Sequence, residues 1–299
     1  MKNKSIFFVV SAGILWGIIS LFIKPLSAMG FSAMQIGFLR SAISFIVLLA
    51  YLLIADRSSL KIKLKDIWMF VGTGILSLAL FNFCYFYAII NGQASIAVVL
   101  LYTSPVFIML MSVPIFKERI TLAKISALVL TLFGCVMVSG VMGGKLNVGA
   151  DVIILGIASG LFYGLYTIFG KLALKKYSSK TVTAYTFLFA FLGMLPICNL
   201  KQTTALMSQQ PKSVLLFLAA AFCCTVMPYF LYTKGLESLE SGKATILVAV
   251  EPLVGAVVGT IFFNEPLNII KGIGIVFILV AIIVLNARWG RKNILKSSE

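Results

Sequence analysis

The chain has 299 residues, of which 61% are hydrophobic and 11% charged, and its mean hydropathy is +1.07. These values exclude a soluble globular domain, and the long uncharged runs that recur along the chain predict an all-α polytopic membrane protein. Because the runs are continuous rather than alternating between apolar and polar residues, a transmembrane β-barrel is also excluded.

Apolar runs of about 18 to 24 residues predict ten transmembrane helices. The expected spans of the first half are residues 5–23, 33–54, 67–90, 94–116 and 121–141. Those of the second half are residues 151–171, 181–199, 213–235, 243–263 and 269–288. Lys2 and Lys4 in front of the first run would also fit a signal peptide. The counterpart of this run lies in the middle of the chain, however, so we interpret it as a retained helix.

The sequence contains two copies of one unit, related by a constant offset of 147 residues. The matching pairs include Gly13 with Gly160, Gly17 with Gly164, Lys24 with Lys171, Tyr85 with Tyr232, Pro105 with Pro252, and Glu118 with Glu265. Five spans per copy is an odd number, so the second copy begins on the side of the membrane opposite to the first. We therefore expect two inverted five-helix repeats at residues 1–143 and 150–290, followed by a cytoplasmic tail at 291–299.

The net charge of +16 lies in the loops between the spans, so we interpret it as a signal of orientation rather than of nucleic-acid binding. With the N-terminus in the cytoplasm, 19 Lys and Arg residues fall in inner segments and 5 in outer segments. The outer five are Lys24, Lys145, Lys201, Lys212 and Lys271, and Arg40 lies within a span. This asymmetry predicts a multi-pass protein of the plasma (inner) membrane with both termini in the cytoplasm.

Glu251 is the one acid in the middle of a predicted span, the ninth, and Arg40 is the one base expected to be buried, about a third of the way into the second span. A charge in hydrocarbon costs on the order of 2.5–3.5 kcal/mol or more, so both side chains are expected to face the bundle interior or water. One interpretation is a site for a substrate or a proton. The other is a structural contact, such as Arg40 holding helix-end carbonyls near the outer surface. The second copy has Phe187 where Arg40 would map, so Arg40 breaks the internal symmetry.

Pro105 and Pro252 lie near the centres of equivalent spans, and Pro228 lies in the eighth. A proline inside a helix removes one backbone hydrogen bond, which deprives the carbonyls of Leu101 and Val248 of their usual donor and bends the helix. Two such bends at symmetric positions near the midplane indicate a gate or a binding site, with a kink that serves packing as the alternative.

Glycines four residues apart recur at the same place in the first span of each copy. These pairs are Gly13 with Gly17 and Gly160 with Gly164. Small residues at this spacing leave a groove that lets another backbone approach closely, so we interpret them as helix-packing residues rather than ligand contacts.

Polar-tipped aromatic side chains and one asparagine are the candidates for lining a central pocket. Asn82 and Tyr85 share one face of the third span with Ile89, and Tyr229 and Tyr232 share one face of the eighth. The other mid-membrane candidates are Trp16, Tyr102, Tyr163 and Tyr166. Aromatic faces with hydroxyl tips suit a cationic or mixed apolar-polar substrate. Contact with lipid or packing against other helices is the alternative for each of them.

Residues needed for several other functions are missing. Gly144-Lys145 is not a P-loop, because Ser139 stands where the first glycine is required and Leu146 follows the lysine. Histidine is absent and the five cysteines form no CxxC pair, so we expect no metal site and no cofactor. Glu251 has no carboxylate neighbour in another span, and no serine or cysteine has an evident base, so we do not expect an enzyme.

Several motifs resemble those of EamA-type transporters, a branch of the drug/metabolite transporter superfamily. They are the pair Trp16-Gly17 followed by Lys24, the arginine of FLRSAIS, and SPVFIMLMSVPIFKER with its echo EPLVGAVVGTIFFNEP. The resemblance covers about residues 6 to 288. It implies a secondary carrier with ten helices that works by alternating access, its central cavity lined by spans one, three, four, six, eight and nine.

The sequence and the resemblance together predict a carrier for a small polar metabolite, with Glu251 as the protonation or cation-contact site. The resemblance implies an amino acid, amine, carboxylate, nucleobase or drug-like substrate, and an ion or substrate gradient as the driving force. The expected partners are this small molecule and the lipid bilayer. An uncoupled channel or facilitator is the alternative function, and a membrane scaffold without transport is a third.

Overall fold

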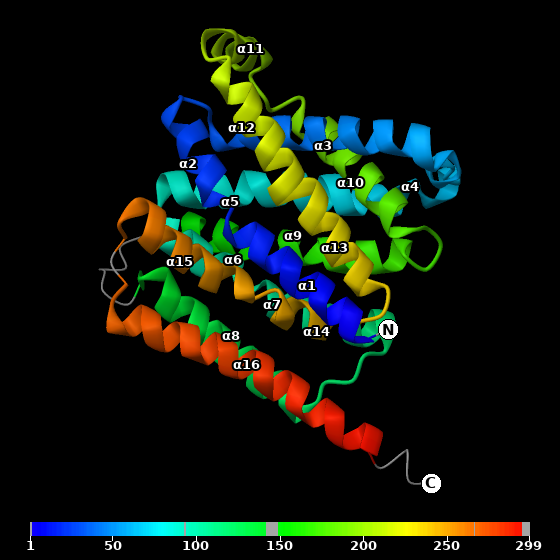
Figure 1. Ribbon diagram of the computed structural model, residues 1–299, viewed down its shortest axis with the longest axis vertical. Helices are drawn as coiled ribbons and strands as arrows, with labels where there is room; N and C mark the ends of the chain where they lie inside the picture. The colour runs from blue at the N-terminus through cyan, green and yellow to red at the C-terminus, as the bar shows by residue number, and fades with distance from the viewer. Residues whose placement is uncertain (1, 93, 142–148, 266, 295–299) are drawn as a thin grey trace.

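The computed structural model describes residues 2–92, 94–141, 149–265 and 267–294, and the regular elements within these ranges are all helical (Figure 1). The first repeat contains α1 (Lys2–Gly17), α2 (Ser20–Ala28), α3 (Ala33–Ala55), α4 (Ile67–Val71), the π-helical η3 (Gly72–Ala79), α5 (Leu80–Asn91), α6 (Ala94–Leu101), α7 (Ser104–Phe116) and α8 (Leu122–Ser139). The second contains α9 (Ala150–Ala173), α10 (Ser179–Met194), α11 (Leu200–Gln209), α12 (Lys212–Ala221), the π-helical η5 (Phe222–Val226), α13 (Met227–Leu236), α14 (Ser241–Leu247), α15 (Val250–Phe263) and α16 (Ile269–Ile294).

The prediction of an all-α polytopic membrane protein is confirmed. Eight helical segments of the described chain are long and apolar enough to cross a membrane. The other two predicted spans correspond to α10, which has 16 residues, and to the apolar part of α16, Ile269–Leu285. α11 is an additional helix that the sequence did not predict. The tail expected at 291–299 is helical as far as Ile294, and residues 295–299 lie outside the described part of the chain.

The two prolines predicted to bend equivalent spans do interrupt them. α6 ends at Leu101 and α7 begins directly before Pro105, while α14 ends at Leu247 and α15 begins two residues before Pro252. Proline has no N–H to donate, and the carbonyl of Val248 accepts a 3.0 Å hydrogen bond from the N–H of Glu251 instead. Each of these spans is therefore two short helices joined near the middle of the bundle.

Three other irregularities are not predicted by the sequence. Span one breaks between α1 and α2, and spans three and eight contain the π-helical stretches η3 and η5. Residues 75–79 of η3 are equivalent to η5 in the second repeat, and Pro228 follows η5 closely. The two repeats therefore share the same irregular backbone at equivalent positions, although π-helical turns have no simple sequence signature.

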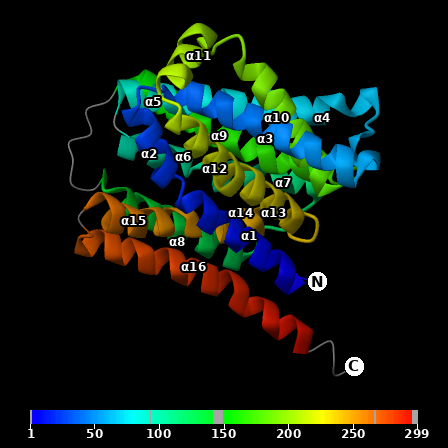
Figure 2. The same ribbon diagram turned by 45° about the horizontal axis from the view of Figure 1, so that its top comes forward.

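Equivalent helices of the two repeats pack on each other in antiparallel pairs. α8 and α16 lie side by side along one edge of the bundle, as Figure 1 and Figure 2 both show. Gly134 of α8 faces Ile278 of α16, whereas Gly140 faces Lys271, so residue numbers rise along one helix as they fall along the other.

The second spans of the repeats, α3 and α10, also pack on each other in antiparallel orientation. The rings of Phe38 and Phe191 are 5.2 Å apart, and the Lys180 ammonium lies 5.4 Å from the ring of Tyr51, near the opposite ends of the two helices. Both equivalent pairs are antiparallel, so the two repeats run through the bundle in opposite directions, as the odd number of spans predicted.

The first helix of each repeat approaches the broken span of the other repeat through its glycines. A Cβ atom on Gly13 would lie 2.8 Å from the carbonyl oxygen of Val248, and one on Gly160 would lie 3.0 Å from that of Leu101. These carbonyls belong to the breaks in spans nine and four. The glycines therefore bring α1 and α9 into backbone contact with the two breaks.

Alanine at either glycine should destabilise the folded protein. In Gly13→Ala or Gly160→Ala the new methyl group overlaps a backbone oxygen that cannot move aside, and we expect a cost of about 1–3 kcal/mol. Gly170→Ala is the matched control on α9, because no atom lies within 4 Å of a Cβ built there. Thermal unfolding in detergent measures the effect. Equal melting temperatures for Gly160→Ala and Gly170→Ala would contradict the close approach.

Candidate functional site

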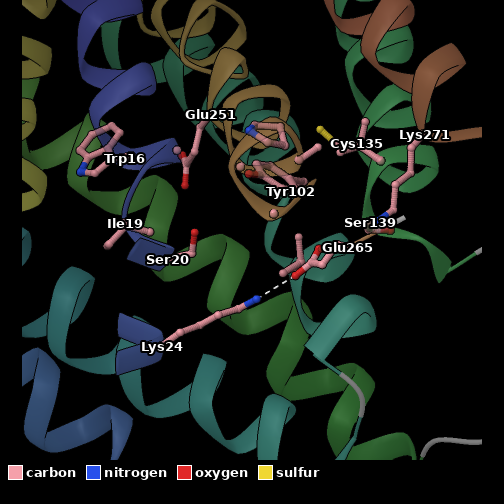
Figure 3. Close-up of a pocket in the computed structure, with 17 residues that line it drawn as sticks. Trp16, Ile19, Ser20, Lys24, Tyr102, Cys135, Ser139, Glu251, Glu265 and Lys271 are labelled. Atoms are coloured by element: carbon pink, nitrogen blue, oxygen red, sulfur yellow. Dashed lines mark hydrogen bonds and ion pairs between the residues drawn. The ribbon is translucent and has the colours of Figure 1, made fainter. Parts of the chain in front are cut away.

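A cavity of about 280 Å³ lies between spans one, four, five and nine, at the end of the bundle that we call the Glu265 end (Figure 3). Its wall includes the side chains of Trp16, Tyr102, Cys135 and Glu251. Three charged residues, Lys24, Glu265 and Lys271, also line it. The cavity therefore combines aromatic surface, charged groups and one acid that lies inside a membrane span.

Glu251 owes its position to the break in span nine. α15 begins at Val250, so Glu251 occupies its first turn, directly before Pro252, and both residues line the cavity. Within the described part of the chain, no hydrogen bond or ion pair joins the Glu251 carboxylate to another residue. An acid at membrane depth that faces a cavity and has no protein partner is available to a proton or to a cation in the cavity.

Five aromatic residues pack together beside the cavity, and we call them the aromatic plug: Trp16, Tyr163, Tyr166, Tyr229 and Tyr232. The ring of Tyr229 lies 4.9 Å from that of Trp16 and 5.0 Å from that of Tyr166, both edge to face. The space that these side chains enclose is about 10 Å³, enough for roughly a single water molecule. The plug thus fills the bundle between spans one, six and eight.

Two buried hydroxyl contacts hold the plug in place. The Tyr166 hydroxyl lies 2.6 Å from the hydroxyl of Thr233, and the Tyr232 hydroxyl lies 2.8 Å from that of Thr167. Each contact joins span six to span eight. These contacts satisfy polar groups that would otherwise be buried without a partner, so the plug is fixed by polar bonds as well as by packing.

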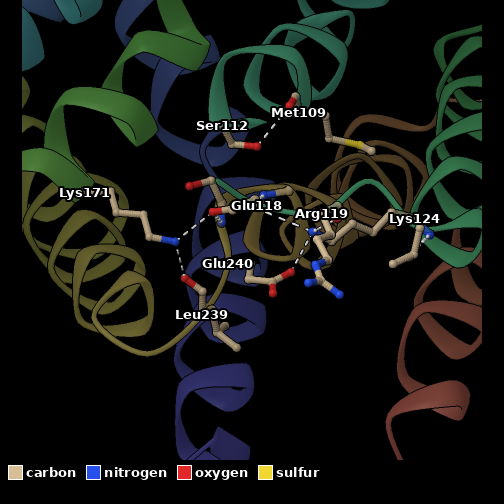
Figure 4. Close-up of polar contacts among 11 residues, drawn as sticks. Met109, Ser112, Glu118, Arg119, Lys124, Lys171, Leu239 and Glu240 are labelled. Carbon is tan, nitrogen blue, oxygen red and sulfur yellow. Dashed lines mark hydrogen bonds and ion pairs between the residues drawn. The ribbon is translucent and has the colours of Figure 1, made fainter. Parts of the chain in front are cut away.

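At the opposite end of the bundle, a network of charges is centred on Glu118 (Figure 4). The Glu118 carboxylate accepts hydrogen bonds from Lys171 Nζ at 2.9 Å and from the backbone N–H groups of Ser241 and Gly242 at 2.7 and 3.3 Å. Lys124 lies 3.8 Å from the same carboxylate and 2.6 Å from that of Glu240. We call these residues the Glu118 cluster. It joins spans four, five, six and nine at this end of the bundle.

The cluster stabilises the ionised form of Glu118, which lies between α7 and α8. Burial acts to raise the pKa of the carboxyl group, but the hydrogen bonds from Lys171, Ser241 and Gly242 outweigh it, and the pKa lies below its ordinary value. Only 6% of the side chain is exposed. A buried carboxylate with this many donors is a stable contact between helices.

The structure brings some of the sequence candidates together and separates others. Tyr102 and Trp16 reach the Glu251 cavity, and Tyr163, Tyr166, Tyr229 and Tyr232 join Trp16 in the plug. Asn82 donates a 2.6 Å hydrogen bond to the carbonyl of Leu78, and Tyr85 stacks on Phe81 with ring centroids 5.4 Å apart. Neither of these two lines the Glu251 cavity or the plug.

Arg40 lies apart from Glu251 and holds span eight. Its Nε donates to the hydroxyl of Thr225 at 2.9 Å, and a second guanidinium nitrogen donates to the carbonyl of Cys224 at 3.1 Å. Both acceptors belong to η5, where the π-helical turn disturbs the regular backbone bonding. The contacts resemble the structural alternative that the sequence left open for Arg40, although the acceptors lie within a span rather than at a helix end.

Sequence reasoning missed the Glu118 cluster. Lys171 and Glu118 are far apart in the sequence and were recognised only as members of matching pairs, not as partners. A signal was available in the two matching pairs, Lys24 with Lys171 and Glu118 with Glu265. If the lysine of one repeat lies against the glutamate of the other, opposite charges meet at both ends of the bundle. In the described part of the chain, no group of three or more His, Cys, Asp or Glu side chains could hold a metal ion.

The fold and the cavity define a multi-pass helical membrane protein made of two inverted repeats around an internal, acid-containing pocket. The sequence profile of the EamA-like transporter family matches residues 3–140 and 151–287. The chain belongs to this family, which is the one that its motifs resemble.

Individual relatives agree with this assignment. An uncharacterized transporter of Archaeoglobus fulgidus is 29% identical over 280 residues, which cover 92% of this chain and 94% of that protein. The uncharacterized transporter YetK of Bacillus subtilis is 23% identical over 253 residues, covering 82% and 76% of the two chains. A solved crystal structure superimposes with a TM-score of 0.78 at 16% identity, covering 97% of this chain and 99% of that one, and it supports the fold.

Removing the Arg40 guanidinium should destabilise the protein. Arg40→Met leaves the Cys224 carbonyl and the Thr225 hydroxyl without their charged donor, at a cost of about 1.5–3 kcal/mol. Thermal unfolding in detergent measures the loss. Arg57→Met is the control, because Arg57 donates to an exposed carbonyl, that of Leu53 near the end of α3. An unchanged melting temperature for Arg40→Met would show that its bonds to η5 contribute nothing.

The pH dependence of stability should contain a contribution from Glu118. The pKa of this group is depressed in the folded state, so its stabilisation is complete above the unfolded pKa of about 4.3 and is lost as the pH falls through the lower folded value. Melting temperatures between pH 7 and pH 3 should therefore decline less steeply in Glu118→Gln than in the parent. Glu237→Gln, which changes the half-exposed ion pair with Lys234, should leave the slope nearly unchanged. Parallel curves for Glu118→Gln and the parent would refute this account.

Proposed function

We propose that the chain is a secondary carrier that moves a small polar metabolite across the plasma membrane by alternating access. The observation that carries the proposal is the position of Glu251. It faces a cavity at the Glu265 end, and the aromatic plug packs beside that cavity. A second cavity of about 960 Å³, lined by residues of the Glu118 cluster at the opposite end, shares none of its described lining residues with the first. In alternating access, each of the two states exposes one central binding site to one side of the membrane, and a central acid that faces a cavity at one end meets this requirement.

The distribution of basic residues supports an orientation for this carrier. With both termini in the cytoplasm, the Glu265 end faces outward and the Glu118 cluster lies on the cytoplasmic side. The described state is then open to the outside. A gradient of an ion or of the substrate itself drives the exchange between this state and its opposite.

The wall of the cavity supports a solute with a positive or strongly polar group. Glu251 offers a carboxylate, and Trp16 and Tyr102 offer aromatic faces, which together suit a small amine or a zwitterion. The same carboxylate can take up a proton when the solute is absent. The aromatic plug leaves room for roughly a single water molecule, which favours a carrier over an uncoupled channel.

A binding screen followed by a transport assay tests the proposal. The purified protein is heated with a panel of amino acids, amines, carboxylates and nucleobases, and each compound that raises the melting temperature is taken into proteoliposomes for counterflow. A carrier exchanges labelled for unlabelled solute and saturates. Flux that rises linearly with concentration and shows no exchange would establish a channel instead, and no stabilising compound in the panel would favour a scaffold.

Glu251→Gln should reduce counterflow by about 10–100-fold, because one charge-assisted contact to the solute or proton is lost. The variant keeps the shape of the side chain, so its melting temperature should stay close to that of the parent. Glu237→Gln removes a carboxylate outside the cavity and should transport at the parental rate. Parental counterflow by a folded Glu251→Gln would remove Glu251 from the mechanism.

A further inference from the structure

The two ends of the bundle carry the same charged corner, once from each repeat. At one end Lys171 of span six pairs with Glu118, and at the other Lys24 of span one pairs with Glu265 at 2.8 Å. Each lysine and each glutamate is separated from its counterpart by 147 residues. Both lysines also lie over the aromatic ring that ends the broken span, Phe116 and Phe263 respectively.

The backbone of the two corners is also the same. Lys117 and Asn264, which precede the glutamates, are the two non-glycine residues in the described chain with positive φ, at 55° and 53°. The N–H of Glu118 donates to the carbonyl of Ser112, and that of Glu265 donates to the equivalent Gly259. The corners are therefore copies in local structure, and a difference in their surroundings comes from the helices packed around them.

These surroundings differ strongly. The Glu118 side chain is 6% exposed and accepts bonds from Lys171 and from the backbone at the start of α14, whereas the Glu265 side chain is 44% exposed. Met109 of span four is buried, and a Cβ atom on Gly242 would lie 3.1 Å from its side chain. The residue equivalent to Met109 is Ala256, which lines the open cavity. The start of span nine thus covers the Glu118 carboxylate, which lies at the edge of a second cavity of about 960 Å³ at this end of the bundle, whereas no helix start among the described residues covers the Glu265 carboxylate in the same way.

We propose that the two corners are alternating latches, and that Glu118 and Glu265 are the positioning residues that hold the two states of the carrier proposed above. In the described state the Glu118 latch is closed. In the opposite state the two glutamates exchange environments. The start of α6, at Ala94 and Ser95, covers the Glu265 carboxylate, as the start of α14 covers Glu118 in the described state. Glu118 then becomes exposed and keeps only its pair with Lys171. Each glutamate thereby stabilises one state selectively, which is the condition for setting its population.

The accessibility of matched cysteines tests the latches without any substrate. Ala256→Cys and Met109→Cys are made separately in a chain whose five native cysteines are replaced by alanine. A membrane-impermeant maleimide is applied to intact cells for position 256 and to inside-out vesicles for position 109. With both glutamates present, position 256 should react quickly and position 109 slowly.

Glu118→Gln should reverse this pattern. The bonds that Glu118 accepts from the backbone N–H groups of Ser241 and Gly242 exist only in the described state, so the population of this state relative to the opposite one falls by about tenfold or more. Labelling at 256 then slows and labelling at 109 accelerates. Lys171→Gln should act in the same direction, because its pair with Glu118 is buried in the described state and exposed in the opposite one, and it serves as the second variant if Glu118→Gln fails to fold. Glu265→Gln should favour the described state further, so that 256 stays fast and 109 becomes slower than in the parent, and Glu237→Gln should change neither rate.

The two proposals fail in different ways. Unchanged rates in folded Glu118→Gln and Lys171→Gln, or a shift of Glu265→Gln in the same direction as Glu118→Gln, would overturn the latches even in a chain that transports. A reciprocal shift in a chain that exchanges no solute would overturn the carrier and leave the latches in place. Folding of each variant is checked by its elution profile in detergent.

Discussion

A helix that breaks inside a membrane is stable only where its unbonded backbone groups meet protein, because lipid supplies no hydrogen-bond donor. The breaks before Pro105 and Pro252 meet this requirement against the glycines of α9 and α1. The contact determines the depth and rotation of the first helix in each repeat. Trp16, less than one turn beyond Gly13, is thereby placed at the break where Glu251 begins its helix. The position of the buried acid thus follows from the packing of one backbone on another.

Inversion of the repeats explains why one sequence element occurs in two environments. A lysine of the first span and a glutamate after the fourth meet across the repeats, so the same pair forms once at each end of the bundle. At one end the acid is buried among donors, and at the other it remains at the surface of a cavity. Since the corners have the same backbone, their environments depend on the position of spans four and nine rather than on their own residues.

Much of this architecture was predictable because its causes are local or periodic. Apolar runs gave the spans, the odd number of spans per repeat gave the inversion, and Pro105 and Pro252 gave the breaks. The hydrogen-bond donors of Glu118 and the acceptors of Arg40 were not predictable, because they lie more than 50 residues away in the sequence and depend on how helices cross. The π-helical turns and the break after Gly17 have no simple sequence signature. α11 does carry one, because Asn199 caps its first turn by accepting a hydrogen bond from the N–H of Gln202. The aromatic plug was predicted in part, since helical spacing gave its members but not their contacts.

Arg40 has no equivalent in the second repeat, where Phe187 packs its ring edge-to-face on Tyr229 with centroids 5.2 Å apart. The bonds of Arg40 to η5 tie span two to span eight with a charged donor, whereas span seven meets span three through a neutral 2.7 Å hydrogen bond between the hydroxyls of Thr186 and Thr73. When the two repeats exchange their conformations, the inward-open and outward-open states therefore differ in free energy. Without solute, such a carrier populates one of its two states more than the other, and this preference sets the fraction of time that each side is open. The net direction of transport is determined by the gradients alone.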